Sequence, residues 1–156
     1  MPILVYNTLT KRKEELIPAK PNWIRMYVCG PTTYNLIHLG NARPLVVFDT
    51  IRRYLVYRGY RVTFVQNFTD VDDKIINRAR EEGQTWREVA ERYIREFWRD
   101  AASLGVQVPD TTPRASEHIP EMIELISLLV EKGYAYVSSG DVYFEVSSFP
   151  SYGQLS

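Results

Sequence analysis

Two polar, glycine-bearing segments of the chain carry side chains suited to binding a phosphate and a small substrate. The first, residues 29–41, reads C-G-P-T-T-Y-N-L-I-H-L-G-N, and the second, residues 67–75, reads N-F-T-D-V-D-D-K-I. His38 and Asn41 offer directional donors, and Gly40 between them lets a ligand approach the backbone closely. These groups could bind the phosphates of ATP and stabilise charge that builds up on the α-phosphate during nucleotidyl transfer. Taken alone, His-x-Gly-Asn is a short pattern, and its histidine could equally be an ordinary residue at the start of a helix.

The acidic and sulfur-bearing residues of these segments leave two further choices open. Cys29 is the one cysteine of the chain, and it is either a small buried apolar residue or a thiolate ligand of a soft metal such as Zn²⁺. Asp70, Asp72 and Asp73 are either carboxylates for Mg²⁺ or acidic residues that suit the first turn of a helix. For the three aspartates we prefer the helical interpretation.

The elements around these segments predict that they meet. Residues 23–29 are rich in strand formers between Pro21-Asn22 and Gly30-Pro31, and residues 61–68 form a second such run. Between them, residues 41–58 have apolar side chains at helical spacing, with Pro44 in the first turn. The pattern predicts a βαβ unit with parallel strands. Because ligands bind outside the carboxyl ends of parallel strands, both segments should line one pocket.

The rest of the chain alternates between helices and turns. We expect helices at residues 70–82, 85–105 and 119–132, the second opened by a capping box of Thr85 and Glu88. Residues 106–116 read as a Pro/Thr connector, and residues 134–146 as a hairpin. Residues 3–17 predict a strand and loop or a hairpin. Arg52 and Arg53 read as a solvated helix face.

Composition excludes some classes of protein. Nineteen basic and nineteen acidic residues give a formal net charge of zero, so overall charge gives no argument for nucleic-acid binding. The first residues lack a secretory signal, and no apolar stretch approaches the roughly 20 residues of a membrane span. We expect a soluble, cytoplasmic protein without a membrane partner.

The chemistry-bearing segments also match a known family. The spelling Cys-Gly-Pro-Thr-x-Tyr-x-x-x-His-x-Gly-Asn-Ala-Arg-Pro, from residue 29, resembles the signature region of cysteinyl-tRNA synthetases with their form of the class I HIGH motif. Residues 64–76, 117–122 and 140–144 resemble further blocks of the family, so the resemblance runs along essentially the whole chain. It implies an α/β, Rossmann-like (HUP-type) parallel-sheet nucleotide-binding domain. The family uses ATP with Mg²⁺ to activate L-cysteine and passes the cysteinyl group to tRNA(Cys).

The resemblance also implies roles for individual residues. His38 and Asn41 would be catalytic by stabilising the transferring phosphate, Gly30 and Thr69 would hold the substrate cysteine, and Cys29 would bind Zn²⁺. Asn41 stands where HIGH has its second histidine, and its amide can donate a hydrogen bond but cannot carry charge. The residues that would contact ATP are Pro31, Thr32, Tyr34, His38, Gly40 and Asn41.

The same comparison predicts how the chain is organised. Residues 1–110 would be the N-terminal half of the catalytic domain, and residues 111–156 the start of the connective insertion that contacts the acceptor stem. The other zinc ligands and the KMSKS-like ATP loop would lie downstream, so we expect a truncated domain that is inactive alone. Two alternatives stay open: a cysteine-activating ligase of mycothiol-type biosynthesis, and a non-catalytic nucleotide-binding or interaction module. The spelling of residues 31–34 and 41–44 favours the synthetase.

Overall fold

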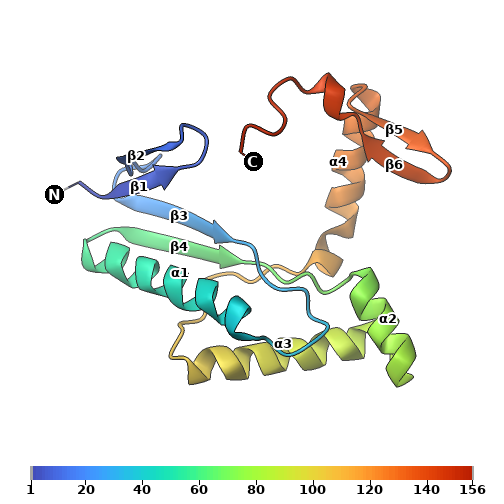
Figure 1. Cartoon of the computed structure of the whole chain (residues 1–156), viewed down its shortest axis with the longest axis horizontal. Helices are drawn as coiled ribbons and strands as arrows, with labels where there is room; N and C mark the ends of the chain where they lie inside the picture. Colours follow the sequence, from blue (N-terminus) through green and yellow to red (C-terminus); the bar gives the residue numbers. More distant parts are fainter. Residues whose placement is uncertain (1, 156) are drawn as a thin grey trace. The chain divides into compact units, whose positions relative to one another are not determined.

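The computed structural model describes residues 2–155, which fall into two compact units (Figure 1). One unit consists of residues 18–117, and the other combines the residues up to 17 with those from 118 onward. No helix of the described chain is long and apolar enough to cross a membrane. The unit of residues 18–117 contains every predicted site residue.

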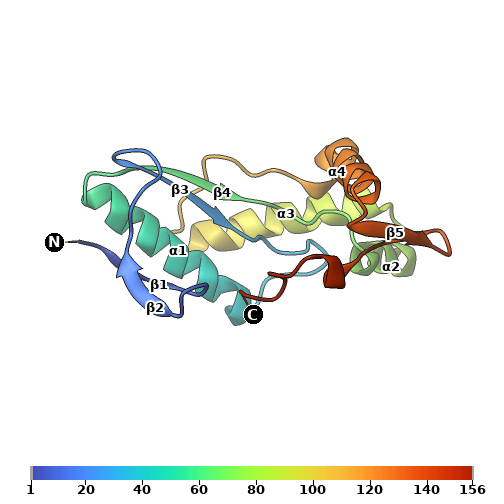
Figure 2. The ribbon, with the colours of Figure 1, turned by 90° about the horizontal axis from the view of Figure 1, so that it is seen from above.

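The unit of residues 18–117 is built on a parallel strand–helix–strand arrangement. Strand β3 (Trp23–Val28) pairs with β4 (Arg61–Gln66) in parallel, from Trp23 opposite Arg61 to Val28 opposite Gln66. Helix α1 (Leu39–Tyr57) connects the two strands, and both views place α1 and α3 (Trp86–Ser103) on the same side of the strand pair (Figures 1 and 2). The predicted βαβ unit and its parallel strands are confirmed.

Helix α1 begins two residues earlier than its apolar pattern predicts. His38 is the N-cap, so Pro44 lies inside the helix rather than in its first turn. A proline at this position has no N–H to donate to the carbonyl of Gly40, four residues earlier. The helix ends at the predicted place, where Gly59 has a φ of +88° that an L side chain rarely adopts.

Helices α2 (Asp73–Glu82) and α3 form the rest of the helical layer. Helix α2 starts at Asp73 with Asp72 as its N-cap, three residues later than predicted. The capping box of α3 is confirmed: the Glu88 N–H donates to Thr85 Oγ1, and the Thr85 N–H donates to Glu88 Oε2. Each cap satisfies backbone donors that a helix leaves unpaired at its start.

The core of this unit contains two apolar clusters contributed by the helices and by Phe68, which follows β4. In one, the Phe68 ring meets Phe97 and Trp98 edge to face, with centroids 5.1 and 5.5 Å away. Helix α3 buries Val89, Tyr93, Phe97 and Ala101, which recur at helical spacing, whereas Leu104 after its end is exposed. The buried members of the two clusters are Ile75, Ala79, Val89, Ala90, Tyr93, Leu45, Phe68, Ile94 and Phe97.

The connector of residues 106–116 lies alongside β4 in parallel. Thr111 bridges to Val65 and Arg114 to Phe68, and backbone bonds run from the Gln66 N–H to the Thr111 carbonyl at 3.1 Å. The connector therefore takes the place of a third strand in the layer. Its proline content conceals this in the sequence, because proline cannot donate to a ladder.

Arg52 and Arg53 of α1 bind the chain at the start of the connector. Arg52 donates to the Val108 carbonyl at 2.8 Å, and Arg53 to the Gly105 carbonyl at 2.7 Å. The expectation of a solvated face was wrong for Arg52, whose side chain is 13% exposed, whereas the Arg53 side chain is 48% exposed. A guanidinium group has several donors, so Arg53 can bind a carbonyl and stay exposed.

The other unit has two hairpins and a helix. Strand β1 (Leu4–Asn7) pairs with β2 (Arg12–Glu15), confirming the hairpin alternative. Helix α4 (Ile119–Glu131) follows the 3₁₀ turn η1 (Ala115–His118), and β5 (Ala135–Ser138) pairs with β6 (Asp141–Phe144) before a second 3₁₀ turn, η2 (Val146–Ser148). Ser139 and Gly140 both have positive φ, as a two-residue hairpin turn with the twist of its strands requires.

Candidate functional site

The two polar segments are joined to each other at the carboxyl ends of β3 and β4. The Thr69 N–H donates to the Pro31 carbonyl, and the Thr33 N–H donates to the Thr69 carbonyl, both at 3.1 Å. The Gly30 N–H donates to Asn67 Oδ1 at 2.8 Å. These bonds continue the ladder beyond the strands, and they place the first segment beside Thr69, as the βαβ prediction requires.

Gly30 is needed because two backbones approach each other closely at this point. A Cβ atom on Gly30 would lie 1.6 Å from the carbonyl oxygen of Asn67. That distance is far inside van der Waals contact, and the obstacle is main chain rather than a flexible side chain. Glycine is therefore fixed here by sterics.

His38 and Asn41 bind each other's backbone at the start of α1. His38 Nδ1 accepts from the Gly40 N–H at 3.0 Å, and Asn41 Oδ1 accepts from the His38 N–H at 3.2 Å. The pair forms a capping box with histidine in the place usually taken by serine or threonine. Because Nδ1 accepts, the neutral ring carries its proton on Nε2, and the amide of Asn41 keeps both N–H groups free. The helix-start role and a phosphate-donor role are thus compatible for these residues.

Gly40 is required by His38 as well as by any ligand. A Cβ atom on Gly40 would lie 2.6 Å from Cε1 of the His38 ring. The ring lies over the glycine, which keeps its Nδ1 within reach of the Gly40 N–H. The glycine therefore fixes the orientation of the histidine.

Two adjoining cavities lie beside this cap. The first, here called the loop cavity, has a volume of about 210 Å³ and is lined by Pro31, Thr32, Tyr34, Asn35, Leu36, Ile37, His38 and Asn41. The second, the strand cavity, has a volume of about 100 Å³ and is lined by Cys29, Gly30, Pro31, Gly40, Asn41, Pro44, Leu45, Gln66 and Phe97. Pro31 and Asn41 line both, so the cavities meet at these two residues.

The structure brings nearly all of the predicted site residues to these cavities. Cys29 and Gly30 line the strand cavity, whereas the predicted ATP contacts divide between the two. Thr69 lines neither and is tied to the site through its backbone. Cys29 is exposed, with Sγ 3.6 Å from the Gly30 carbonyl oxygen, so the alternative of a buried apolar cysteine is wrong.

The acidic residues of the second segment have three different roles. Asp72 caps α2 by accepting from the Lys74 N–H at 2.9 Å, and Asp73 lies in the first turn, as the helical interpretation predicts. Asp70 is buried outside the helix, where it accepts from the N–H and hydroxyl of Ser116 at 2.9 and 2.6 Å. The helical interpretation is therefore wrong for Asp70, which anchors the end of the connector.

A metal site is not assembled by this part of the chain. Among residues 2–155, no group of three or more His, Cys, Asp or Glu side chains could hold an ion. Cys29 supplies one soft ligand, whereas zinc in a substrate-binding site takes about three from protein. The residues present do not fit a complete zinc site.

Two contributors to the site went unrecognised in the sequence. Gln66 of β4 lines the strand cavity and is buried, with a relative exposure of 5%. Lys74 places its Nζ 5.4 Å from the centroid of Tyr34, a lining residue of the loop cavity. Gln66 could have been found from its place between Phe64 and Phe68, since alternate residues of a strand share a face.

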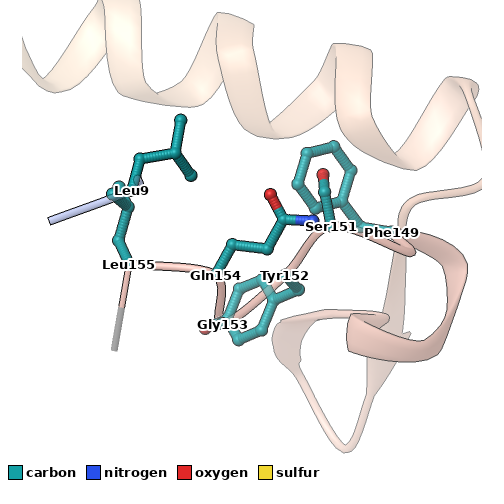
Figure 3. Close-up of a pocket in the computed structure, with 7 residues that line it drawn as sticks. All are labelled: Leu9, Phe149, Ser151, Tyr152, Gly153, Gln154 and Leu155. Atoms are coloured by element: carbon teal, nitrogen blue, oxygen red, sulfur yellow. The ribbon is translucent and has the colours of Figure 1, made fainter. Parts of the chain in front are cut away.

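A larger hollow occurs in the other unit but carries none of the predicted residues. Its volume is about 550 Å³, and Figure 3 shows Leu9, Phe149 and residues 151–155 around it. None of its lining side chains carries a charge. It offers no group for phosphate or acyl chemistry, so the cavities beside His38 are the better candidate. The residues of this hollow are Leu9, Phe149, Ser151, Tyr152, Gly153, Gln154 and Leu155.

Solved structures identify the fold first. LeuRS of Agrobacterium radiobacter, in a ternary complex with tRNA and LeuAMS, matches 77% of this chain and 16% of its own, with a TM-score of 0.65 and 21% identity. Methionyl-tRNA synthetase of Mycobacterium tuberculosis, in complex with methionyl-adenylate, matches 73% of this chain and 22% of its own, with a TM-score of 0.64 and 21% identity. The fold is the Rossmann-like one of class I synthetases.

The family follows from the sequence. Residues 15–156 match the family of class I (C) tRNA synthetase catalytic domains, and the chain belongs to that family. Curated relatives named cysteine–tRNA ligase from Moorella thermoacetica and Carboxydothermus hydrogenoformans are 64% and 60% identical over 152 residues. These alignments cover 97% of this chain but 32% and 33% of the relatives, so the chain spans about a third of their length.

Proposed function

We propose that these residues serve in a cysteine–tRNA ligase, which activates L-cysteine with ATP and Mg²⁺ and transfers it to tRNA(Cys). The observation that carries the proposal is the junction of the two polar segments, which sets an exposed cysteine beside a His–Asn capped helix. The names of the curated relatives support the choice of amino acid and tRNA. A cytoplasmic location fits this activity.

The loop cavity is the proposed site of the ATP phosphates. The start of α1 favours an anion through its free N–H groups and the helix dipole. His38 Nε2 and the Asn41 amide are the free donors of the capping box, and they would stabilise charge on the α-phosphate. Pro31, Thr32 and Tyr34 would form the wall of the nucleotide site.

The strand cavity is the proposed site of the cysteine. Cys29 would supply one thiolate to Zn²⁺, with the other ligands outside the described residues. Such an ion, when bound, holds a substrate thiolate and rejects serine. Gly30 lines the strand cavity and would position the substrate directly. Thr69 would contribute from the adjoining backbone junction, where it is bonded to Pro31 and Thr33.

The domain assignment also remains a proposal. We place the N-terminal half of the catalytic domain at residues 1–110 and the start of the acceptor-stem insertion at residues 111–156. The compact units divide between residues 117 and 118, and the residues up to 17 group with those from 118 onward. The connector of residues 106–116 packs with β4, so the compact units divide later in the chain than the proposed boundary at residues 110 and 111.

Cysteine-dependent ATP–pyrophosphate exchange tests the activity. A polypeptide of the relatives' full length that carries these residues should exchange with cysteine, and residues 1–156 alone should not. Exchange with serine in place of cysteine would overturn the proposal. Transfer of the activated cysteine to an amino sugar rather than to tRNA would favour the mycothiol-type alternative.

Metal analysis tests the ligand count. Purified residues 1–156 should contain well below one equivalent of zinc, because Cys29 is the only thiolate ligand that they offer. The full-length polypeptide should contain about one equivalent, and Cys29→Ala should lower it. Stoichiometric zinc in residues 1–156 would contradict this, and a non-catalytic nucleotide-binding module would show no zinc at either length.

A further inference from the structure

Gln66 places an amide in a layer that is otherwise apolar. Phe64, Gln66 and Phe68 lie on one face of the β4 segment, with relative exposures of 4%, 5% and 2%. That face packs against the helices, where Phe68 clusters with Leu45 and Phe97. An apolar side chain is the ordinary occupant of such a buried position, so the presence of an amide there needs an explanation.

The side chain of Gln66 makes no hydrogen bond within residues 2–155, and its amide atoms, unlike Arg92 Nε and Glu96 Oε2, keep some accessible surface. The side chain lines the strand cavity, where Cγ of Gln66 lies 3.5 Å from the position of a Cβ built on Gly30. Nearly all amides in such places are paired with protein, water or a ligand. The Gln66 amide is therefore open to a partner in the strand cavity, either water or a small ligand.

The strand cavity differs from the loop cavity in what it can hold. At about 100 Å³ it has room for a few waters or a small molecule, but not for a nucleotide. Its lining includes the thiol of Cys29 and the amide of Asn41, whereas His38 and Tyr34 line only the loop cavity. The occupant of the strand cavity is thus the smaller of the two substrates.

We infer that the Gln66 amide hydrogen-bonds the amino-acid substrate in the strand cavity and contributes to its affinity, an inference that rests on the proposed function. The amide oxygen can accept from an ammonium group, and the amide nitrogen can donate to a sulfur or carboxylate. Gln66 does not line the loop cavity, which is the proposed site of the ATP phosphates. Its loss should therefore separate the KM for the amino acid from the KM for ATP.

The test is Gln66→Met in the full-length polypeptide, measured by ATP–pyrophosphate exchange and thermal melting. Methionine keeps the length of the side chain and removes its hydrogen bonds. The KM for cysteine should rise about tenfold, the effect of one hydrogen bond to a charged group, while the KM for ATP stays within about twofold. The melting temperature should stay the same or rise, because an unpartnered amide is replaced by an apolar group. The control is Gln107→Met, at an exposed glutamine of the connector. It should change neither the two KM values nor the melting temperature.

The other outcomes overturn the inference in distinguishable ways. An unchanged KM for cysteine, or equal rises in both KM values, would reject the role of Gln66 and leave the proposed function standing. A Gln66→Met protein that melts far lower or fails to fold would show that the amide has a partner within the protein. Gln66→Asn is a second check on the role of Gln66. Its shorter side chain keeps an amide at this position but does not extend as far into the cavity. Its KM for cysteine should therefore rise as much as that of Gln66→Met. Absence of exchange in the unmodified protein would reject both proposals.

Discussion

At the scale of single residues, Gly30 makes the strictest demand on the sequence. Gly30→Ala should destabilise the fold by about 3 kcal/mol, because its Cβ would meet the Asn67 carbonyl oxygen at 1.6 Å and the backbone must move. Gly59→Ala is the matched control: its Cβ meets nothing within 4 Å, and only its φ of +88° opposes the change. That strain costs about 1 kcal/mol. Urea denaturation measures both, and equal losses would contradict the backbone clash.

The residues of the site divide into those that sequence reveals and those that only packing reveals. His38, Gly40 and Asn41 were predictable, since their types and spacing already describe an anion site at a helix start. The strand pattern places Gln66 on the face of Phe64 and Phe68, but the cavity beside it is formed by Leu45 and other side chains from distant parts of the chain and could not be predicted. Whether Cys29 is buried or exposed also depended on the fold, because a short sequence pattern carries no information on solvent access.

At the scale of elements, Asp70 ties the end of β4 to the end of the connector. Asp70→Ala should lower the free energy of unfolding by about 2 kcal/mol, because the N–H and hydroxyl of Ser116 both lose a charged acceptor. Hydrogen exchange at the Ser116 amide should accelerate. Asp73→Ala, which removes an exposed carboxylate in the first turn of α2, should cost about 0.5 kcal/mol. Similar losses from the two variants would contradict the anchoring role of Asp70.

Glu82 connects α2 to α3 through two guanidinium groups. The hydrogen bond from Arg92 is the main cause that lowers the pKa of Glu82, with Arg78 adding to it. Since the folded pKa lies below the unfolded one, the stabilisation is complete above the unfolded pKa and is lost as pH falls through the folded pKa. As the pH is lowered from about 6 to about 3, the urea midpoint of Glu82→Gln should therefore fall less steeply than that of the unmodified protein. Glu81→Gln, at the exposed neighbouring carboxylate, should keep the slope of the unmodified protein.

The elements were predictable wherever local signals and packing agree. The box of Thr85 and Glu88 fixed the start of α3, because both hydrogen bonds are local. The start of α2 was misplaced, since nothing local shows that Asp70 is bound by Ser116, 46 positions later. The strand-like course of the connector was missed for the same reason: its partner carbonyls and N–H groups belong to β4.

At the scale of the whole molecule, the two units differ in how much of their surface they bury. Helix α3 has six buried residues, whereas no residue of α4 is buried in the described chain. Amides of α3 should therefore exchange only through global unfolding, and those of α4 through openings of much lower free energy. Hydrogen exchange followed by mass spectrometry of residues 1–156 measures this difference. Equal protection of α3 and α4 would show that α4 is covered by an interaction outside these contacts.

The pairing of β3 with β4 has a consequence for how the protein is made. Trp23 donates its indole N–H to Thr63, 40 positions further along the chain. At a synthesis rate of about 5 to 20 residues per second, β3 leaves the ribosome about 2 to 8 seconds before its partner strand is complete. During that interval its backbone groups and the apolar side chains of Ile24 and Val28 are open to other chains. Slower translation lengthens this interval, so translation speed and chaperone supply should affect the yield of folded protein.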